Sequence, residues 1–147
     1  MNKTNQVARE LVCSGVDKLF TRTLLSWYKV HGRHTLPWQK SNDWYPRLLS
    51  EIMLQQTQVQ TVIPYFEKFL AAYPTANQLA KADDDAVMKL WAGLGYYARC
   101  RNLLKAIRAV EFDQGGIAPS VAEEWVKLPG IGPVSYTHLR AHETKAN

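Results

Sequence analysis

Residues 49–59, which read Leu-Ser-Glu-Ile-Met-Leu-Gln-Gln-Thr-Gln-Val, are the segment best equipped for chemistry. They place one carboxylate, that of Glu51, among apolar residues and follow it with three glutamines and a threonine. The preceding Tyr45-Pro46 pair favours a helix start, because proline is well tolerated in the first turn. A carboxylate partly removed from water has its charged form disfavoured, so Glu51 can keep a proton near neutral pH and act as a general acid. Spacing alone favours the simpler interpretation, a solvated glutamate on a helix face.

Residues 93–99, Gly-Leu-Gly-Tyr-Tyr-Ala-Arg, place two aromatic rings and a cation directly after a glycine loop. An aromatic side chain at this point can insert into a base stack, and Gln56 can fill the gap from the opposite side. Enzymes that act on a base within a duplex must extrude it, so some group has to hold the gap open. The alternative is that both tyrosines belong to the core, which suits Tyr97 better than Tyr96.

Residues 128–132 read Leu-Pro-Gly-Ile-Gly and follow a predicted helix that ends near Lys127. Paired glycines let the backbone turn sharply and present its N–H groups at a helix start, which is a good anion site for a DNA phosphate. We therefore expect Gly130 and Gly132 to bind phosphate, a contact that positions the duplex without reading its sequence. A tight turn selected only for its geometry is the alternative.

Other side chains are candidates for lesser roles. Trp27, Trp91 and Trp125 fall on helical apolar stripes, which favours the core, and Trp44 is undecided. Four arginines are candidates for DNA phosphate contacts, although a solvated surface position explains each of them equally well: Arg33, Arg47, Arg99 and Arg101.

The elements that must position these residues are all predicted helices. Apolar residues recur at three- and four-residue steps along residues 16–30, 59–73 and 100–107. Thr75 and Asp83 have the residue types and spacing of helix N-caps. Because no segment alternates as a strand does, we predict an all-α bundle of short helices joined by tight loops.

The composition fits one globular domain. The 147 residues are 46% hydrophobic and 21% charged, enough to bury a core. The formal charge of +5 favours an anionic partner, but only weakly. Cys13 and Cys100 are too few and too distant in sequence to form a metal site by themselves, and they fit a reducing cytosol. Because no apolar run is long enough to span a bilayer, we expect a soluble cytoplasmic protein with no membrane partner.

Taken in order, these motifs resemble the bacterial adenine DNA glycosylase family, MutY. The resemblance covers residues 26–134 and rests on four motifs at compatible spacings: 36–38 (Leu-Pro-Trp), 50–59, 93–99 and 128–132. It implies the all-α helix-hairpin-helix DNA glycosylase fold, with an incomplete six-helix barrel in this chain. It also implies hydrolysis of the N-glycosidic bond of adenine mispaired with 8-oxoguanine or guanine, by a monomer that acts on double-stranded DNA in the bacterial nucleoid.

The resemblance also assigns roles to individual residues. Glu51 is the expected proton donor, because protonation of adenine N7 lets the base leave neutral while an oxocarbenium-like sugar forms. Gln56 and Tyr96 are the expected intercalating pair. Leu36 and Trp38 are expected to line the adenine pocket, where a flipped purine gains stacking and apolar contact.

Part of the family's machinery lies beyond the hairpin. The family takes a second carboxylate from an aspartate in a V-D-G-N-V type motif, holds a 4Fe-4S cluster with four cysteines, and recognises 8-oxoguanine with a C-terminal domain. This chain ends before all three, so we expect the fragment to be inactive alone. Below, "full-length protein" means a protein that contains this segment together with the aspartate motif, the four cysteines and the C-terminal domain.

Three domains are predicted along the chain. Residues 1–35 form an N-terminal helix and loop, which packs with the iron-sulfur domain in the full-length family. Residues 36–134 form the truncated helix-hairpin-helix glycosylase domain. Residues 135–147 depart from the family's small-residue, apolar pattern, and we expect them to be a non-native tail.

Two alternative functions fit parts of the pattern. An endonuclease III-like glycosylase and lyase has an apolar residue at the position of Glu51 and a nucleophilic lysine at that of Val134, so both positions argue against it. A non-catalytic helix-hairpin-helix module would bind DNA without chemistry. Release of a base from an 8-oxoguanine:adenine duplex separates these functions.

Overall fold

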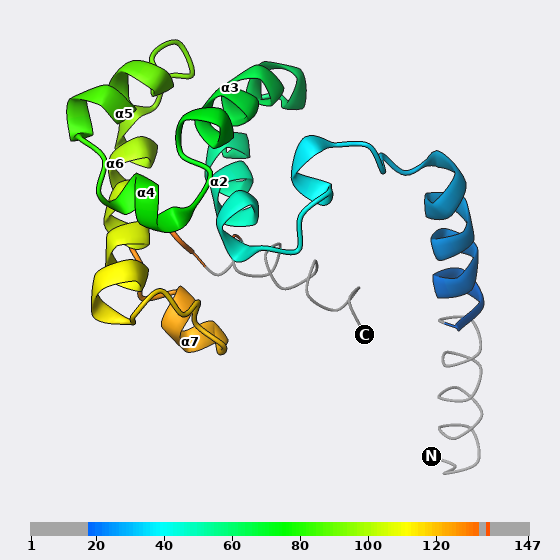
Figure 1. Cartoon of the computed structure of the whole chain (residues 1–147). Coiled ribbons are helices and arrows are strands. Elements are labelled where there is room, and N and C mark those ends of the chain that lie inside the picture. The colour runs from blue at the N-terminus through cyan, green and yellow to red at the C-terminus, as the bar shows by residue number, and fades with distance from the viewer. Residues whose placement is uncertain (1–17, 133–134, 136–147) are drawn as a thin grey trace, which may run out of the picture. The chain divides into compact units, whose positions relative to one another are not determined.

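The computed structural model describes residues 18–132 and Ser135, and every regular element within them is a helix (Figure 1). The all-α prediction is therefore confirmed. The chain divides into two compact units, Met1–His34 and Thr35–Asn147, which we describe separately. Within the described residues, no helix has the length and apolar character needed to cross a membrane.

The described part of the first unit is one helix, residues 18–31, followed by a short loop. Its apolar side chains lie open to solvent: Leu19, Phe20 and Trp27 are 58%, 65% and 56% exposed. The core position predicted for Trp27 is wrong, because the described part of this unit holds no second element on which the stripe can pack. The Trp27 ring instead stacks on His31, with ring centroids 5.0 Å apart.

The second unit is a bundle of short helices joined by tight loops (Figure 1). In chain order its described elements are the 3₁₀ helix η1 (Pro37–Gln39), the α-helices α2 (Trp44–Leu54), α3 (Val59–Ala72), α4 (Ala76–Ala80), α5 (Asp84–Trp91) and α6 (Tyr97–Arg108), the π-helical turn η2 (Ala109–Asp113), and α7 (Ala122–Trp125).

Side-chain caps explain where several of these helices begin. The Asp43 side chain accepts from the backbone N–H of Tyr45, so α2 begins at Trp44, one residue before the predicted start. The predicted capping box at Thr75 is confirmed at the start of α4. The predicted cap Asp83 is confirmed at the start of α5, where its carboxylate accepts from the N–H of Ala86.

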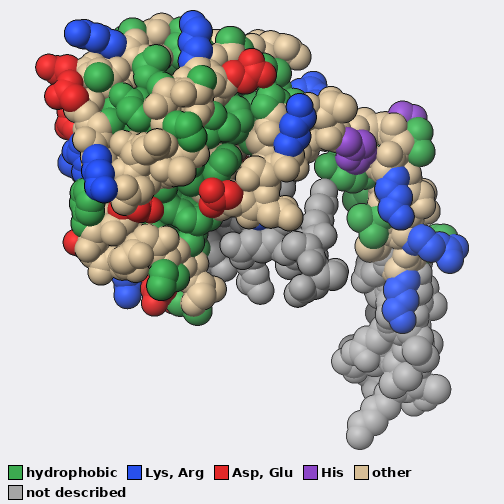
Figure 2. All heavy atoms as spheres, in the orientation of Figure 1, with side chains coloured by type: hydrophobic (Ala, Val, Ile, Leu, Met, Phe, Trp, Pro, Cys, Tyr) green, Lys and Arg blue, Asp and Glu red, His purple; other side chains and the backbone are tan. Residues whose placement is uncertain are grey.

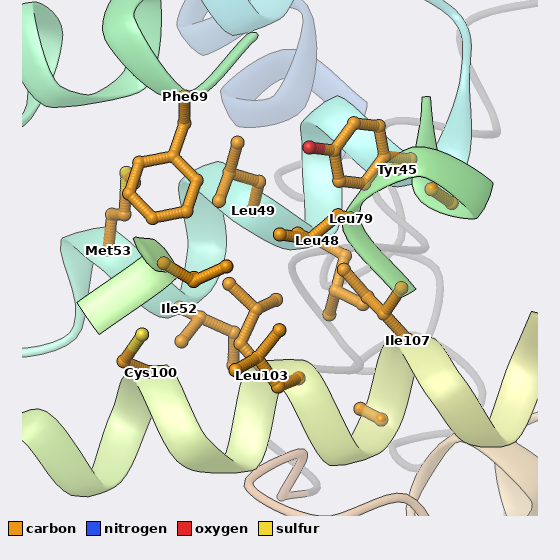
Figure 3. Packing of buried hydrophobic residues seen from close by; sticks show 14 of the residues in the cluster. Tyr45, Leu48, Leu49, Ile52, Met53, Phe69, Leu79, Cys100, Leu103 and Ile107 are labelled. Carbon is orange, nitrogen blue, oxygen red and sulfur yellow. The ribbon is translucent and has the colours of Figure 1, made fainter. Parts of the chain in front are cut away.

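The core lies where α2 packs against η1, α3 and α6 (Figure 3). Burying a leucine, isoleucine or phenylalanine side chain stabilises the fold by roughly 1.5–3 kcal/mol, so the buried side chains of these helices contribute much of the stability of the bundle. Trp91 and Trp125 lie in the core as predicted, and Trp44 packs against its edge. The largest fully buried side chains are Trp91, Tyr45, Phe66, Phe69, Leu48, Leu49, Ile52, Met53, Leu79, Leu103, Leu104 and Ile107.

Candidate active site

Glu51 lies in the second half of α2 and is half-buried. Its neighbours Ile52 and Met53 are fully buried and anchor that part of the helix in the core. Gln55 follows Glu51 by four residues, so the two project from the same face one turn apart. The core therefore fixes the helix that carries the carboxylate. The carboxylate of Glu51 lies one turn before Gln55, which caps the C-terminal end of α2.

The hairpin motif meets the end of α2. The Gln55 side-chain amide donates to the carbonyl oxygen of Gly130 at 3.5 Å and to the hydroxyl of Ser135 at 3.2 Å. Leu128 and Ile131 are buried, whereas Gly130 is exposed, so the apolar residues of the motif anchor it while its turn faces outward. Motifs that are 75 residues apart in sequence are thus adjacent in the fold.

An open cavity of about 540 Å³ lies at this junction. The cavity brings together Gln56 and Tyr96, the two residues predicted to intercalate, from two separate segments of the chain. Within the described residues its lining consists of Gln55, Gln56, Tyr96, Ala98, Arg99 and Ser135.

Gln56 and Tyr96 share an unusual backbone conformation. Their φ angles are 57° and 48°, and they are the two non-glycine residues with left-handed backbone in the described part of the chain. This region is costly for residues with a Cβ, and such strain gathers at functional sites. Both side chains are exposed, Tyr96 by 63%. Tyr97, on the first turn of α6, is 42% exposed and so less exposed than Tyr96, which is the expected order, but the core alternative holds for neither residue.

Leu36 and Trp38 lie in and beside η1. Trp38 is 6% exposed, and its ring packs edge-on against Phe66 of α3 with centroids 5.4 Å apart. Leu36 is partly buried against the core. Neither residue is among those that line the cavity.

Both alternatives left open for Arg99, a phosphate contact and a solvated surface position, are wrong. Its side chain is only 9% exposed, and its guanidinium donates to backbone carbonyls of α2 and of the glycine loop. Sequence reasoning missed this role, although Arg99 directly precedes the buried stripe that begins at Cys100. Arg33 and Arg101 are exposed, and Arg47 is half-buried and donates to Asn42 at 2.9 Å.

Charge alone does not mark a DNA-binding face in the view of Figure 2. In that view the lysine and arginine side chains of the helical bundle are interspersed with acidic ones, whereas those of the helix at residues 18–31 have no acidic side chain among them.

No three His, Cys, Asp or Glu side chains within the described residues are close enough to hold a metal ion. Cys100 is a free thiol inside the core, and burial raises its pKa to about 12, so it stays protonated and unreactive. Cys13 lies outside the described residues. The described part of the chain therefore offers no ligand set for the 4Fe-4S cluster that the resemblance implies.

Gly130 offers a test of how tightly the hairpin is built. Its φ is +79°, and an added Cβ would lie 2.8 Å from Cβ of Asn102, whereas at Gly115 (φ +67°) an added Cβ would meet nothing within 4 Å. Both alanine substitutions strain the backbone, but only Gly130→Ala also overpacks the contact with α6. We expect Gly130→Ala to lower the free energy of unfolding by roughly 1–3 kcal/mol more than Gly115→Ala.

Denaturant unfolding of the two full-length variants measures this difference. Equal destabilisation would mean that the hairpin is free to move away from Asn102.

The protein-family model and the similar proteins that this chain matches agree on one family. The model of the HhH-GPD superfamily base excision DNA repair protein matches residues 49–142. This match extends into the predicted non-native tail, whose foreign origin stays a prediction. The adenine DNA glycosylase of Buchnera aphidicola subsp. Baizongia pistaciae is 47% identical over 114 residues, which are 78% of this chain and 32% of the relative. The human adenine DNA glycosylase is 43% identical over 122 residues, covering 77% of this chain and 22% of the relative.

A solved structure supports the same fold. The structure of a thermostable thymine-DNA glycosylase superposes with a TM-score of 0.78 at 26% identity, covering 87% of this chain and 59% of that one. The chain spans about a third or less of the length of the curated relatives described above.

Proposed function

Because this chain belongs to the HhH-GPD superfamily of base excision DNA repair proteins, we propose that the full-length protein hydrolyses the N-glycosidic bond of adenine mispaired with 8-oxoguanine or guanine in double-stranded DNA. One observation carries the proposal. The two residues predicted to hold a flipped base out of the stack, Gln56 and Tyr96, meet at one cavity, a turn beyond Glu51. The names of the similar proteins, adenine DNA glycosylase, support the choice of base.

Glu51 supplies the proton in the mechanism that we propose. It protonates N7 of the extruded adenine, and the electrons of the C1′–N9 bond pass to N9, so the base leaves neutral. The sugar becomes oxocarbenium-like, and a water molecule adds its hydroxyl to C1′ and loses a proton to solvent. A second carboxylate should stabilise the cationic sugar, and we place it outside the described residues. No step is assigned to a 4Fe-4S cluster.

The remaining site residues position the DNA. Gly130 and Gly132 bind a phosphate through their backbone N–H groups. An added Cβ at Gly132 would meet nothing within 4 Å, so the fold does not require glycine there, and the free space suits a close phosphate. Leu36 and Trp38 contact the flipped adenine, Trp38 as a rigid apolar wall because Phe66 holds its ring.

The proposal extends to organisation and location. We assign residues 1–35 to an N-terminal helix and loop and residues 36–134 to the glycosylase domain. The full-length protein acts as a monomer on DNA of the bacterial nucleoid, in the cytoplasm, and holds a 4Fe-4S cluster outside the described residues.

Single-turnover excision tests the reaction. With the full-length protein in excess over an 8-oxoguanine:adenine duplex, we expect free adenine and an abasic site that is cut only after alkali treatment. Strand cleavage without alkali, together with a borohydride-trapped covalent adduct, would indicate the endonuclease III-like lyase. Mismatch binding without base release would indicate a non-catalytic DNA-binding module.

A further inference from the structure

The Arg99 guanidinium joins two segments that are far apart in sequence. Its side chain is almost fully buried, and the two N–H groups of each terminal nitrogen are shared among three acceptor oxygens. Nη1 donates to the carbonyl oxygens of Ile52 (3.1 Å), Met53 (2.9 Å) and Gln55; Nη2 donates to Oγ1 of Thr57 (3.0 Å) and to the carbonyl oxygens of Leu94 (3.3 Å) and Gly95 (3.4 Å).

These acceptors surround the two left-handed residues. Gln55 and Thr57 are the neighbours of Gln56 on either side, and both accept from Arg99. Gly95 directly precedes Tyr96, and the Tyr96 ring lies with its centroid 5.3 Å from the guanidinium carbon. Arg99 therefore contacts the chain next to both strained residues at the same time.

Left-handed conformations of non-glycine residues need such support. They persist only where the surrounding contacts over-determine the backbone. A guanidinium suits this task, because its planar fork of donors can satisfy several fixed carbonyls in one geometry. Burial lowers the pKa of Arg99, and the carbonyls together with the Trp91 ring, 5.6 Å from the guanidinium carbon, offset the loss of water around its charge.

We infer that Arg99 is a positioning residue, which holds Gln56 and Tyr96 in their left-handed conformations so that both side chains enter the DNA-facing cavity together. It acts on the reaction only through these two residues. The inference deepens the proposed function, on which it rests for what the pair does to DNA.

Arg108 provides a matched control on the same helix. Its Nε donates to the carbonyl oxygen of Ala80 at 3.0 Å, and its Nη2 donates to the carbonyl oxygen of Ala82 at 3.0 Å and to Asp84 at 2.6 Å. It fastens the chain between α4 and α5, and none of the residues that it contacts has left-handed backbone. A purely structural role for Arg99 would resemble that of Arg108.

The experiment compares Arg99→Lys with Arg108→Lys in the full-length protein. An ammonium keeps the charge but has three donors and no planar fork, so Arg99→Lys cannot hold both segments at once. At a temperature where both variants are folded, we expect Arg99→Lys to lower the single-turnover rate of adenine release roughly 100-fold. Arg108→Lys should stay close to the wild-type rate.

Two further measurements separate positioning from general destabilisation. Hydrogen exchange should accelerate in residues 54–57 and 94–97 of Arg99→Lys, and in residues 80–84 of Arg108→Lys. The fluorescence of 2-aminopurine placed beside the target adenine should rise on binding of the wild-type protein and of Arg108→Lys, but much less with Arg99→Lys. If Arg99→Lys does not fold, Thr57→Val replaces it. Loss of this acceptor, together with the weak 3.4 Å donation from the Thr57 hydroxyl to the Gln55 carbonyl, should lower the rate about five-fold.

Equal excision rates for the two lysine variants would overturn the inference, as would an unchanged rate for Thr57→Val. Absence of adenine release by the wild-type protein would instead overturn the proposed function. In that case, hydrogen exchange alone tests whether Arg99 positions Gln56 and Tyr96. Faster exchange at both segments of Arg99→Lys supports it, and unchanged exchange at either segment contradicts it.

Discussion

Replacing Glu51 by glutamine is expected to lower the single-turnover rate of adenine release by the full-length protein about 10²–10⁴-fold. Glutamine has the size and shape of glutamate, so the half-buried position on α2 keeps its packing. It has no acidic proton to give to N7, so the base must leave with unfavourable negative charge. Binding to the mismatched duplex should change little, because the phosphate contacts and the intercalating pair are intact.

Glu67→Gln is the matched control for this substitution. Glu67 is an exposed carboxylate on α3, so its loss should leave the excision rate unchanged. An unchanged excision rate for Glu51→Gln would end the assignment of Glu51 as the proton donor.

The sequence predicted the helices well, because their signals are local. Thr75 and Asp83 occupy the cap positions that their side chains predicted. The buried faces of α5 and α6 follow the apolar periodicity, with Val87 and Trp91 buried in α5 and Cys100 in α6. A helix N-cap or an apolar stripe depends on residues three or four positions apart. The relative positions of such residues are set as soon as the helix forms.

The burial expectations for Trp27 and Arg99 failed, because both depend on the tertiary surroundings of the side chain. A stripe such as that of Trp27 predicts which face of a helix is apolar, but only the tertiary structure shows what covers that face. An arginine such as Arg99 is usually exposed, and its burial became visible only when the carbonyls of α2 and of the glycine loop were placed around it. Neither error concerns local structure.

For the candidate site, the sequence predicted the residue types but not the backbone conformation. The motifs containing Gln56 and Tyr96 predicted residue types that can intercalate, and the fold brings these residues to one cavity. Their left-handed backbone had no sequence signal, because neither glutamine nor tyrosine favours φ > 0. A contact network assembled from distant segments holds these conformations. The residue types in these motifs therefore predict which side chains belong to the site. Tertiary contacts decide the backbone conformation in which those side chains are held.

Replacing Tyr96 by alanine is expected to weaken binding of the full-length protein to an 8-oxoguanine:adenine duplex by roughly 1–3 kcal/mol, the value of one aromatic stack on a base. The φ of 48° is strained for alanine as it is for tyrosine, so the substitution removes the ring without relieving the backbone. Binding to a fully paired duplex should weaken much less, because it depends on phosphate contacts rather than on a wedge.

Tyr97→Ala is the control for the Tyr96 prediction, since it removes an exposed ring from the adjacent position, on the first turn of α6. Titration of both duplexes with each variant, at a fixed salt concentration, gives the specificity ratio directly. Tyr96→Ala should lower this ratio, and Tyr97→Ala should leave it nearly unchanged. If Tyr96→Ala instead weakens binding to both duplexes equally, its ring supports the fold around Arg99 and does not enter the base stack.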